Sequence, residues 1–294
     1  LKVYEGESFG FLGHNGAGKT TTIKCIIGLI HKTSGRILIH GTDIDPSVHH
    51  AIMGYLPEHP YFYDHLTVLE TLDFFAALHG YSNPERRKKV IETLEVVGLA
   101  DRQQSSVRSL SKGLQQRLGF AQAIINKPKL LLLDEPFSGL DPLGRLEIRN
   151  LILDLKKSGT TIFMSSHILS DVEDICDRVS IMTQGVLRSV FSLADRAMFS
   201  DRCVDITVEL QAEHIELREQ LESGAVEHDS FARGEHQLAR YSFPNYKAAV
   251  DAARAVFESG AVLVEFQSSN ASLEEIFMDI TRAARDKTNG KYHN

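Results

Sequence analysis

Eight consecutive residues near the start of the chain have the types and spacing of a phosphate-binding loop. An apolar, strand-like segment at residues 9–12 precedes them, and an apolar helical segment at residues 22–29 follows. Glycines allow successive backbone N–H groups to point at phosphate oxygens, and the start of a helix adds partial positive charge. We therefore predict that phosphate is bound by these eight residues, Gly13, His14, Asn15, Gly16, Ala17, Gly18, Lys19 and Thr20, and by Thr21 directly after them.

Two residues of this loop have chemistry of their own. The ammonium group of Lys19 should reach the terminal phosphates of a nucleotide, and the hydroxyl of Thr20 is placed to ligate Mg²⁺. A glycine-rich turn without a ligand is the competing interpretation. The strand before the loop and the helix after it argue against that interpretation, because both are needed for phosphate binding.

A second group of candidate residues ends an apolar strand at residues 130–133, where Asp134 and Glu135 follow directly. The carboxyl ends of parallel strands form the edge at which α/β proteins bind ligands. Asp134 can hold Mg²⁺ there, and Glu135 can polarise an attacking water. An acidic strand end by itself is more often a helix cap or a solvated turn. Together with the phosphate loop, it predicts a magnesium nucleotide site.

Between these two motifs, residues 110–117 read Leu-Ser-Lys-Gly-Leu-Gln-Gln-Arg, a small-residue helix start followed by apolar residues at helical spacing. This segment resembles the signature of ATP-binding-cassette (ABC) ATPases, which is usually Leu-Ser-Gly-Gly-Gln. Residues 55–58 resemble the glutamine loop of that family, residues 138–141 its aspartate loop, and residues 165–167 its switch histidine. The resemblance covers roughly residues 1–190 in order and spacing.

The resemblance implies that ATP and Mg²⁺ are the ligands and that the chain is an ATPase. Glu135 would be the general base, His167 a sensor of the γ-phosphate, and Lys19 a third catalytic residue. Thr20, Asp134 and Glu58 would surround the metal ion. A histidine such as His167, taken alone, is more often a core or capping residue.

The resemblance also implies a dimer, because the signature and the phosphate loop of one chain cannot serve the same nucleotide. Ser111 and Gly113 of one subunit would contact the nucleotide held at Lys19 of the other, and Asp141 would lie at the same interface. The second subunit can be another copy or a similar chain.

Two departures from the family pattern indicate which subgroup of the family this chain resembles. Glu58 stands where the family usually has glutamine, and Lys112 stands where it has the first signature glycine. Together with residues 272–277, they resemble a bacterial exporter subgroup whose ATPase pairs with a separate integral membrane permease. We therefore expect a cytoplasmic protein, peripheral on the inner face of the membrane. The transported substrate would be chosen by the permease.

Two rival functions remain open at this point. A soluble ABC ATPase could act on DNA, ribosomes or metal-cluster assembly, but the insertions or second cassette of such proteins are not found here. A formal net charge of -7 gives no general attraction for nucleic acid, so no nucleic-acid partner is expected. The chain could also be a non-catalytic remnant, which magnesium-dependent ATPase activity lost on Lys19→Ala would reject.

The chain opens with Leu1 and leads almost at once into the strand before the phosphate loop. We expect that an N-terminal strand carrying the family's adenine-stacking aromatic residue has been lost. Tyr4 is a poor substitute for that residue, so the phosphates and the metal would hold most of the nucleotide. No apolar stretch approaches the roughly 18 residues that span a bilayer.

Up to about residue 190, short apolar strands alternate with helices, and these elements must position the candidate site residues. This alternation predicts an α/β fold. The resemblance makes this a P-loop NTPase of the ABC type at residues 1–192, lacking its N-terminal start. Strand-free residues 61–122, with helix starts at Thr67 and at Asn83-Pro84, predict an inserted helical subdomain. Further strands are expected at residues 36–39, 54–56, 160–164 and 179–183, with a hairpin turn at Gln184-Gly185.

A second, small α+β domain is predicted at residues 203–285, followed by a polar tail at residues 286–294. Its order of strand, helix, two strands, helix and strand is that of a ferredoxin-like unit. Ser272 is expected to cap the last helix. The domain either mediates dimerisation or regulation, or is an inert cap. We favour dimerisation because of its exposed strand edges, and dimerisation unchanged by deletion after residue 200 would count against it. The strands are expected at residues 204–210, 225–227, 238–243 and 261–266, and the helices at 214–221 and 246–257.

Overall fold

The computed structural model describes residues 1–44, 49–194, 204–211, 214–233, 236–268 and 273–289. The chain divides into two compact units, Leu1–Leu193 with Ile280–Asn294, and Ala194–Asp279. This division differs from the predicted boundaries because it assigns the residues after Asp279 to the first unit. The final helix continues to Asn289, where a polar tail from residue 286 was expected.

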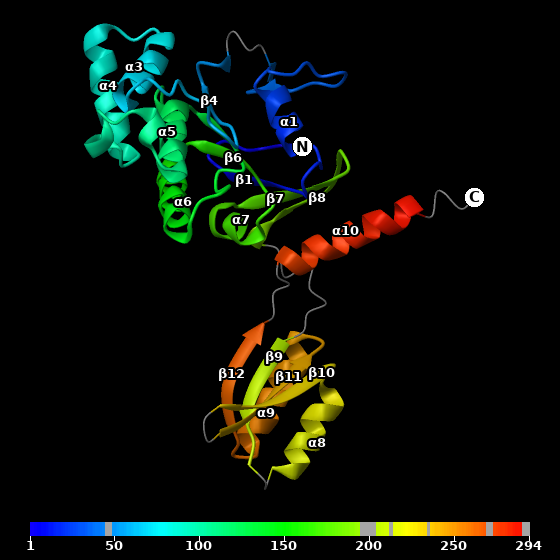
Figure 1. The fold of residues 1–294 in the computed structure, drawn as a ribbon. Coiled ribbons are helices and arrows are strands. Elements are labelled where there is room, and N and C mark those ends of the chain that lie inside the picture. The colour runs from blue at the N-terminus through cyan, green and yellow to red at the C-terminus, as the bar shows by residue number, and fades with distance from the viewer. Residues whose placement is uncertain (45–48, 195–203, 212–213, 234–235, 269–272, 290–294) are drawn as a thin grey trace. The chain divides into compact units, whose positions relative to one another are not determined.

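A six-stranded sheet in the order β4-β5-β6-β1-β7-β8 forms the centre of the first unit (Figure 1). All neighbouring strands in it are parallel except β7 and β8, which are antiparallel. Strands β1, β5 and β6 have almost wholly buried side chains, as expected for a parallel sheet covered on both faces. The strands are β1 Ser8–Leu12, β4 Met53–Leu56, β5 Leu130–Asp134, β6 Thr161–Ser166, β7 Arg178–Thr183 and β8 Val186–Ser192.

Three helices of this unit form a group beside the edge of the sheet. Helices α3, α4 and α5 pack against one another, and α5 contacts β4 at the edge of the sheet (Figure 1). These helices fall in the segment at residues 61–122 that was expected to be helical, except that α5 continues to Ile124. The helices are α1 Lys19–Ile26, α3 Val68–Leu78, α4 Asn83–Val96, α5 Lys112–Ile124, α6 Pro142–Lys157 and α7 Leu169–Ile175, with short 3-10 helices at Ala100–Arg102 and Val107–Ser109.

Capping boxes start two of the three subdomain helices. Thr67 and Glu70 exchange side-chain and backbone hydrogen bonds at the start of α3, as predicted. Helix α4 begins at Asn83, as predicted from Asn83-Pro84, and its capping box is formed by Ser82 with Glu85. Each box satisfies backbone N–H groups that the first helical turn leaves without a partner.

Two predicted elements of this unit are corrected. The strand expected at residues 36–39 is shorter and lies outside the main sheet, because Leu38–Ile39 (β2) pairs only with Thr42–Asp43 (β3). The helix expected at residues 22–29 begins at Lys19 and ends at Ile26, so the last loop residues belong to its first turn. The apolar residues after Ile26 include Leu29, which is 68% exposed and therefore does not extend the buried helix face.

The turn between β7 and β8 confirms the hairpin predicted at Gln184-Gly185. Both residues have positive φ angles, 50° and 75°. Two positive φ values are typical of the turn whose twist matches a two-residue β-hairpin.

The second unit has the predicted strand and helix order around a four-stranded antiparallel sheet, β10-β11-β9-β12. The strand expected at residues 225–227 is instead Glu227–Arg233 (β10), because the preceding helix extends to Gly224. The predicted cap Ser272 lies outside the described residues. The other elements are β9 Val204–Glu209, α8 Ile215–Gly224, β11 His236–Phe243, α9 Tyr246–Glu258 and β12 Val262–Ser268. Helix α10, Leu273–Asn289, has residues in both units.

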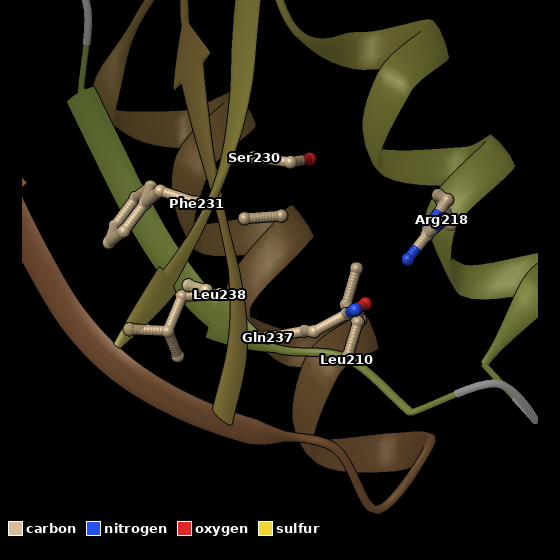
Figure 2. A pocket seen from close by; sticks show the side chains of 8 residues that line it. Leu210, Arg218, Ser230, Phe231, Gln237 and Leu238 are labelled. Atoms are coloured by element: carbon tan, nitrogen blue, oxygen red, sulfur yellow. The ribbon is translucent and has the colours of Figure 1, made fainter. Parts of the chain in front are cut away.

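A shallow pocket of about 230 Å³ lies in this unit between α8 and the hairpin of β10 and β11. In Figure 2, Arg218 projects from α8 towards Ser230 and Gln237 of the hairpin. Strands β10 and β12 are the two edges of the sheet. Exposed edges of this kind can pair with another chain, and dimerisation through this unit stays a prediction.

Among the described residues, no helix combines the length and the apolar character needed to cross a membrane.

Candidate phosphate-binding and catalytic site

The phosphate loop lies between buried strand β1 and helix α1, as the sequence predicts. Gly18 caps the helix with a φ of 107°, a conformation that side chains with a Cβ rarely adopt. A Cβ at this position would also lie 3.0 Å from Cε of Met182. Glycine is therefore required for the helix to begin directly at Lys19, and this start places Lys19, Thr20 and Thr21 in its first turn.

Lys19, at the end of this loop, is almost completely buried, with 5% of the residue exposed. Its Nζ donates a 2.7 Å hydrogen bond to the carbonyl oxygen of Gly13 and lies 3.1 Å from Oε1 of Glu135. A buried ammonium group is costly unless it is paired. The structure therefore joins the phosphate loop and the acidic strand end through one ion pair.

Glu135 directly follows β5 in a left-handed backbone conformation, with a φ of 48°. Its N–H donates to Oγ of Ser165 at 3.0 Å, and its Oε2 lies 2.7 Å from Nδ1 of His167. Unusual backbone angles at non-glycine residues cost energy and persist where neighbouring contacts determine them. Lys19, Glu135 and His167, which are far apart in the sequence, thus form one continuous cluster.

Asp134 lies next to this cluster and is 1% exposed. Its Oδ1 accepts hydrogen bonds from Oγ1 of Thr20 at 3.1 Å and from Oγ of Ser165 at 2.6 Å. In the described part of the chain, no three His, Cys, Asp or Glu side chains gather as a metal site. The hydroxyl and carboxylate oxygens present here suit Mg²⁺, which usually takes one or two carboxylates together with phosphate oxygens and water.

Tyr55 of β4 shares this region. Burial and, to a smaller extent, the negative charge of Asp134 raise the pKa of its hydroxyl to about 12. Tyr55 is therefore neutral throughout the physiological pH range, and it adds no charge beside the carboxylates.

The remaining predicted site residues lie elsewhere in the first unit. Glu58 follows β4, and its Oε1 accepts a hydrogen bond from Oγ of Ser138 at 3.3 Å. Ser111 caps α5 by accepting from the N–H of Leu114, and Gly113 lies in the first turn of that helix. Asp141 caps α6 and accepts from the N–H of Gly144 at 2.8 Å. Contacts of these residues with nucleotide or metal therefore stay predictions.

Sequence reasoning used Ser165 only as part of the histidine motif and missed its own role. Its hydroxyl bonds both Asp134 and the backbone of Glu135, and it is 0% exposed. The available signal was its place at the end of β6, opposite Asp134 in the pairing of β5 with β6. A small polar residue at the carboxyl end of a buried strand, beside an acidic strand end, could have indicated it.

Replacing Ser165 with alanine should lower the free energy of unfolding by about 1–3 kcal/mol, because Asp134 and the Glu135 N–H lose a buried partner. Ser180 is the matched control, because it is equally buried and its Oγ has no hydrogen-bond partner in the described residues. Ser180→Ala should be neutral or stabilising, since it removes an unsatisfied buried hydroxyl. Urea unfolding at equal m values measures both variants, and equal losses would contradict the assignment.

Comparison with solved structures identifies the class of fold. An ATP-binding subunit of an ABC transporter superposes with a TM-score of 0.61 at 34% identity, covering 68% of this chain and 84% of that one. A dimeric ATP-binding cassette in a post-hydrolysis state, bound to ADP and Pi, gives a TM-score of 0.60 at 26% identity. That match covers 66% of this chain and 88% of the other. The first unit therefore has the fold of the ABC ATPases.

Sequence comparison leads to the same family. The family model described as ABC transporter matches residues 1–138. An ABC transporter ATP-binding protein of Nostoc sp. is 41% identical over 284 residues, which make up 95% of this chain and 81% of that protein. The chain belongs to the ABC transporter family, among its ATP-binding proteins.

Two further relatives are matched over part of their length. The bacitracin transport ATP-binding protein of Bacillus licheniformis is 44% identical over 190 residues, which cover 64% of this chain and 61% of that protein. An ABC transporter ATP-binding protein of Synechocystis sp. is 47% identical over 197 residues, which cover 66% of this chain and 56% of that protein. The chain thus spans little more than half the length of some of its relatives.

Proposed function

We propose that this chain binds ATP with Mg²⁺ at the phosphate loop and hydrolyses it to drive export through a separate membrane permease. The observation that carries the proposal is the cluster of Lys19, Glu135 and His167, with the contact between Thr20 and Asp134 beside it. It combines a cation, a carboxylate and an imidazole with two oxygen donors for a metal ion. These are the groups that phosphoryl transfer to water requires.

In the proposed mechanism, the phosphates of ATP attract the ammonium group of Lys19. Oε1 of Glu135, which lies 3.1 Å from that ammonium, then becomes available to accept a proton from the attacking water. His167 remains on Oε2 and orients the carboxylate, and its exposed side faces the γ-phosphate as a sensor. Thr20 and Asp134 would hold Mg²⁺, which would supply positive charge to offset the negative charge of the phosphates.

The proposed active form contains two subunits. Ser111 caps helix α5 and Gly113 lies in its first turn, so backbone N–H groups and a helix N-terminus are available to phosphate. We infer that these groups contact the γ-phosphate bound at Lys19 of the second subunit. The solved relative bound to ADP and Pi is itself dimeric. Asp141 would lie at the same interface.

Coupling to export is the second half of the proposal. It is supported by Glu58 and Lys112, which depart from the general ABC pattern in the manner of an exporter subgroup. It is also supported by two relatives that are named as transport or transporter ATP-binding proteins. The chain would act in the cytoplasm, bound to a permease at the inner face of the membrane.

Affinity purification from detergent-solubilised membranes tests the coupling. We expect an integral membrane protein to co-purify with the chain and to be lost in the untagged control. Recovery of ribosomes or DNA in its place would contradict the transporter role. Mass spectrometry of the co-purified protein would also identify the permease that selects the substrate.

A further inference from the structure

One face of helix α5 contacts the segment that follows the proposed catalytic carboxylate. Lys112 and Gln116 are four residues apart and therefore lie on the same face of the helix. The amide of Gln116 is 2% exposed and donates a 3.0 Å hydrogen bond to the carbonyl oxygen of Pro136. One turn earlier, the side chain of Lys112 lies against Gly139. Helix α5 thus contacts this segment at two points.

The contact between Lys112 and Gly139 depends on the glycine. Gly139 has a φ of 66°, and a Cβ there would lie 2.7 Å from Cε and 3.1 Å from Cδ of Lys112, and closer still to its Nζ. Lys112 and Gly139 are both exposed, and a Cβ at residue 139 would push the end of the flexible lysine side chain away from this place. Within the described residues the side chain of Lys112 has no hydrogen bond or ion pair. The contact is therefore one of packing.

The charge of Lys112 is not favoured by the helix that carries it. Lys112 is the first residue of a helix with 13 residues, and the first turn of that helix contains no acidic residue. A cation at a helix N-terminus is unfavourable because it faces the positive end of the helix dipole. The position of the lysine is thus not explained by its own helix.

The contacted segment controls the backbone on the carboxyl side of Glu135. The N–H of Ser138 donates to the carbonyl oxygen of Glu135 at 3.0 Å, and its hydroxyl donates to Glu58 at 3.3 Å. Strand β6 fixes the amino side of Glu135 through Ser165. The turn formed by Ser138 and Gly139 therefore supports the backbone of Glu135 on its carboxyl side, while Lys19 and His167 hold its side chain.

We propose that Lys112 and Gly139 form a packing latch between the signature helix and the catalytic segment, and that Lys112 is a positioning residue for Glu135. The proposal rests on the proposed ATPase function. The methylene groups of Lys112 restrain the turn at Gly139, and this turn holds the backbone of Glu135. Movement of α5 within the helical subdomain is thereby passed to the proposed base of the same chain.

Two substitutions of Lys112 separate packing from charge. Lys112→Ala should lower kcat on the order of tenfold, less than the about 100-fold cost of an ångström of misplacement, with KM for ATP little changed. Lys112→Met keeps a long apolar side chain without the charge and should retain kcat within about twofold, because such swaps preserve packing volume. If Lys112→Met were as impaired as Lys112→Ala, the lysine would act by its charge and the latch would be rejected.

Gly139→Ala supplies the partner test, because its Cβ displaces Lys112 while the charge is kept, and its backbone strain at a φ of 66° is the same in the single and double variants. The double variant Lys112→Ala with Gly139→Ala should be no slower than the slower single variant, since both break one contact. If the fold losses in kcat of the two single variants multiplied in the double variant, the proposal would be overturned. Lys88→Ala, an exposed lysine of α4, is the matched control and should leave kcat unchanged.

Hydrogen exchange of the nucleotide-free protein tests the latch without any hydrolysis. The amides of Ser138 and Leu140 bond to carbonyl oxygens within the segment. They should exchange about fivefold faster in Lys112→Ala and at the wild-type rate in Lys112→Met. Unchanged exchange in Lys112→Ala would reject the latch. A wild-type protein without ATPase activity would instead reject the proposed function, so the two failures are distinguishable.

Discussion

Replacing Glu135 with glutamine is expected to lower kcat for ATP hydrolysis by about 100-fold or more, the usual contribution of a general base. Glutamine has nearly the same shape but cannot accept a proton at neutral pH. ATP binding should persist, because Lys19 keeps its bond to Gly13 and the phosphate loop is unchanged. The measurement is phosphate release under saturating ATP and Mg²⁺, together with the Kd for ATP by fluorescence titration.

The same variant tests the proposed dimer. A protein that binds ATP but does not hydrolyse it should accumulate as a nucleotide-bound dimer, which sedimentation or light scattering detects. A protein that stays monomeric with ATP and Mg²⁺ well above its nucleotide affinity would contradict the arrangement of Ser111 and Gly113 across two subunits. Glu219→Gln, on the exposed surface of α8, is the charge-matched control and should behave like wild type.

The chemistry-bearing motifs were predictable from the sequence because each depends on residues that are close in the chain. The phosphate loop and the acidic strand end each occupy fewer than ten consecutive residues. Alternation of apolar strands and helices then implied a parallel sheet, and the carboxyl ends of β1, β5 and β6 meet at one edge of it. The approach of Glu135 to Lys19 follows from that topology.

What the sequence did not reveal depends on register and on three-dimensional contacts. The role of Ser165 requires the pairing of Asp134 with Ser165, which a shift of one residue would abolish. The contact of Lys112 with Gly139 joins two segments whose approach no local pattern encodes. Residues 36–39 look like a buried strand by composition, yet Leu38 is 51% exposed in a short separate hairpin. Propensity indicated strand there but not the sheet it would join.

Replacing Lys19 with alanine is expected to weaken ATP binding by about 10-fold to 100-fold and to remove hydrolysis. The ammonium group forms charge-assisted contacts to phosphate that are worth about 1.5–3 kcal/mol each. Isothermal titration with ATP and Mg²⁺ measures the binding, and phosphate release measures the hydrolysis. Lys24→Ala, in the last turn of α1, is the control and should bind ATP normally. Hydrolysis retained in Lys19→Ala would reject the proposed site.

The same substitution should destabilise the protein before any nucleotide is added. Glu135 is 7% exposed, and removal of Lys19 takes away the ammonium group beside its Oε1. His167 still contacts Oε2, but leaving Oε1 of a buried carboxylate without a partner costs about 1–3 kcal/mol, so the urea midpoint should fall. The double variant Lys19→Ala with Glu135→Gln should recover part of that loss, because a neutral amide needs no counter-charge. If the double variant were less stable than Lys19→Ala alone, the ion pair would not be the link between the phosphate loop and the acidic strand end.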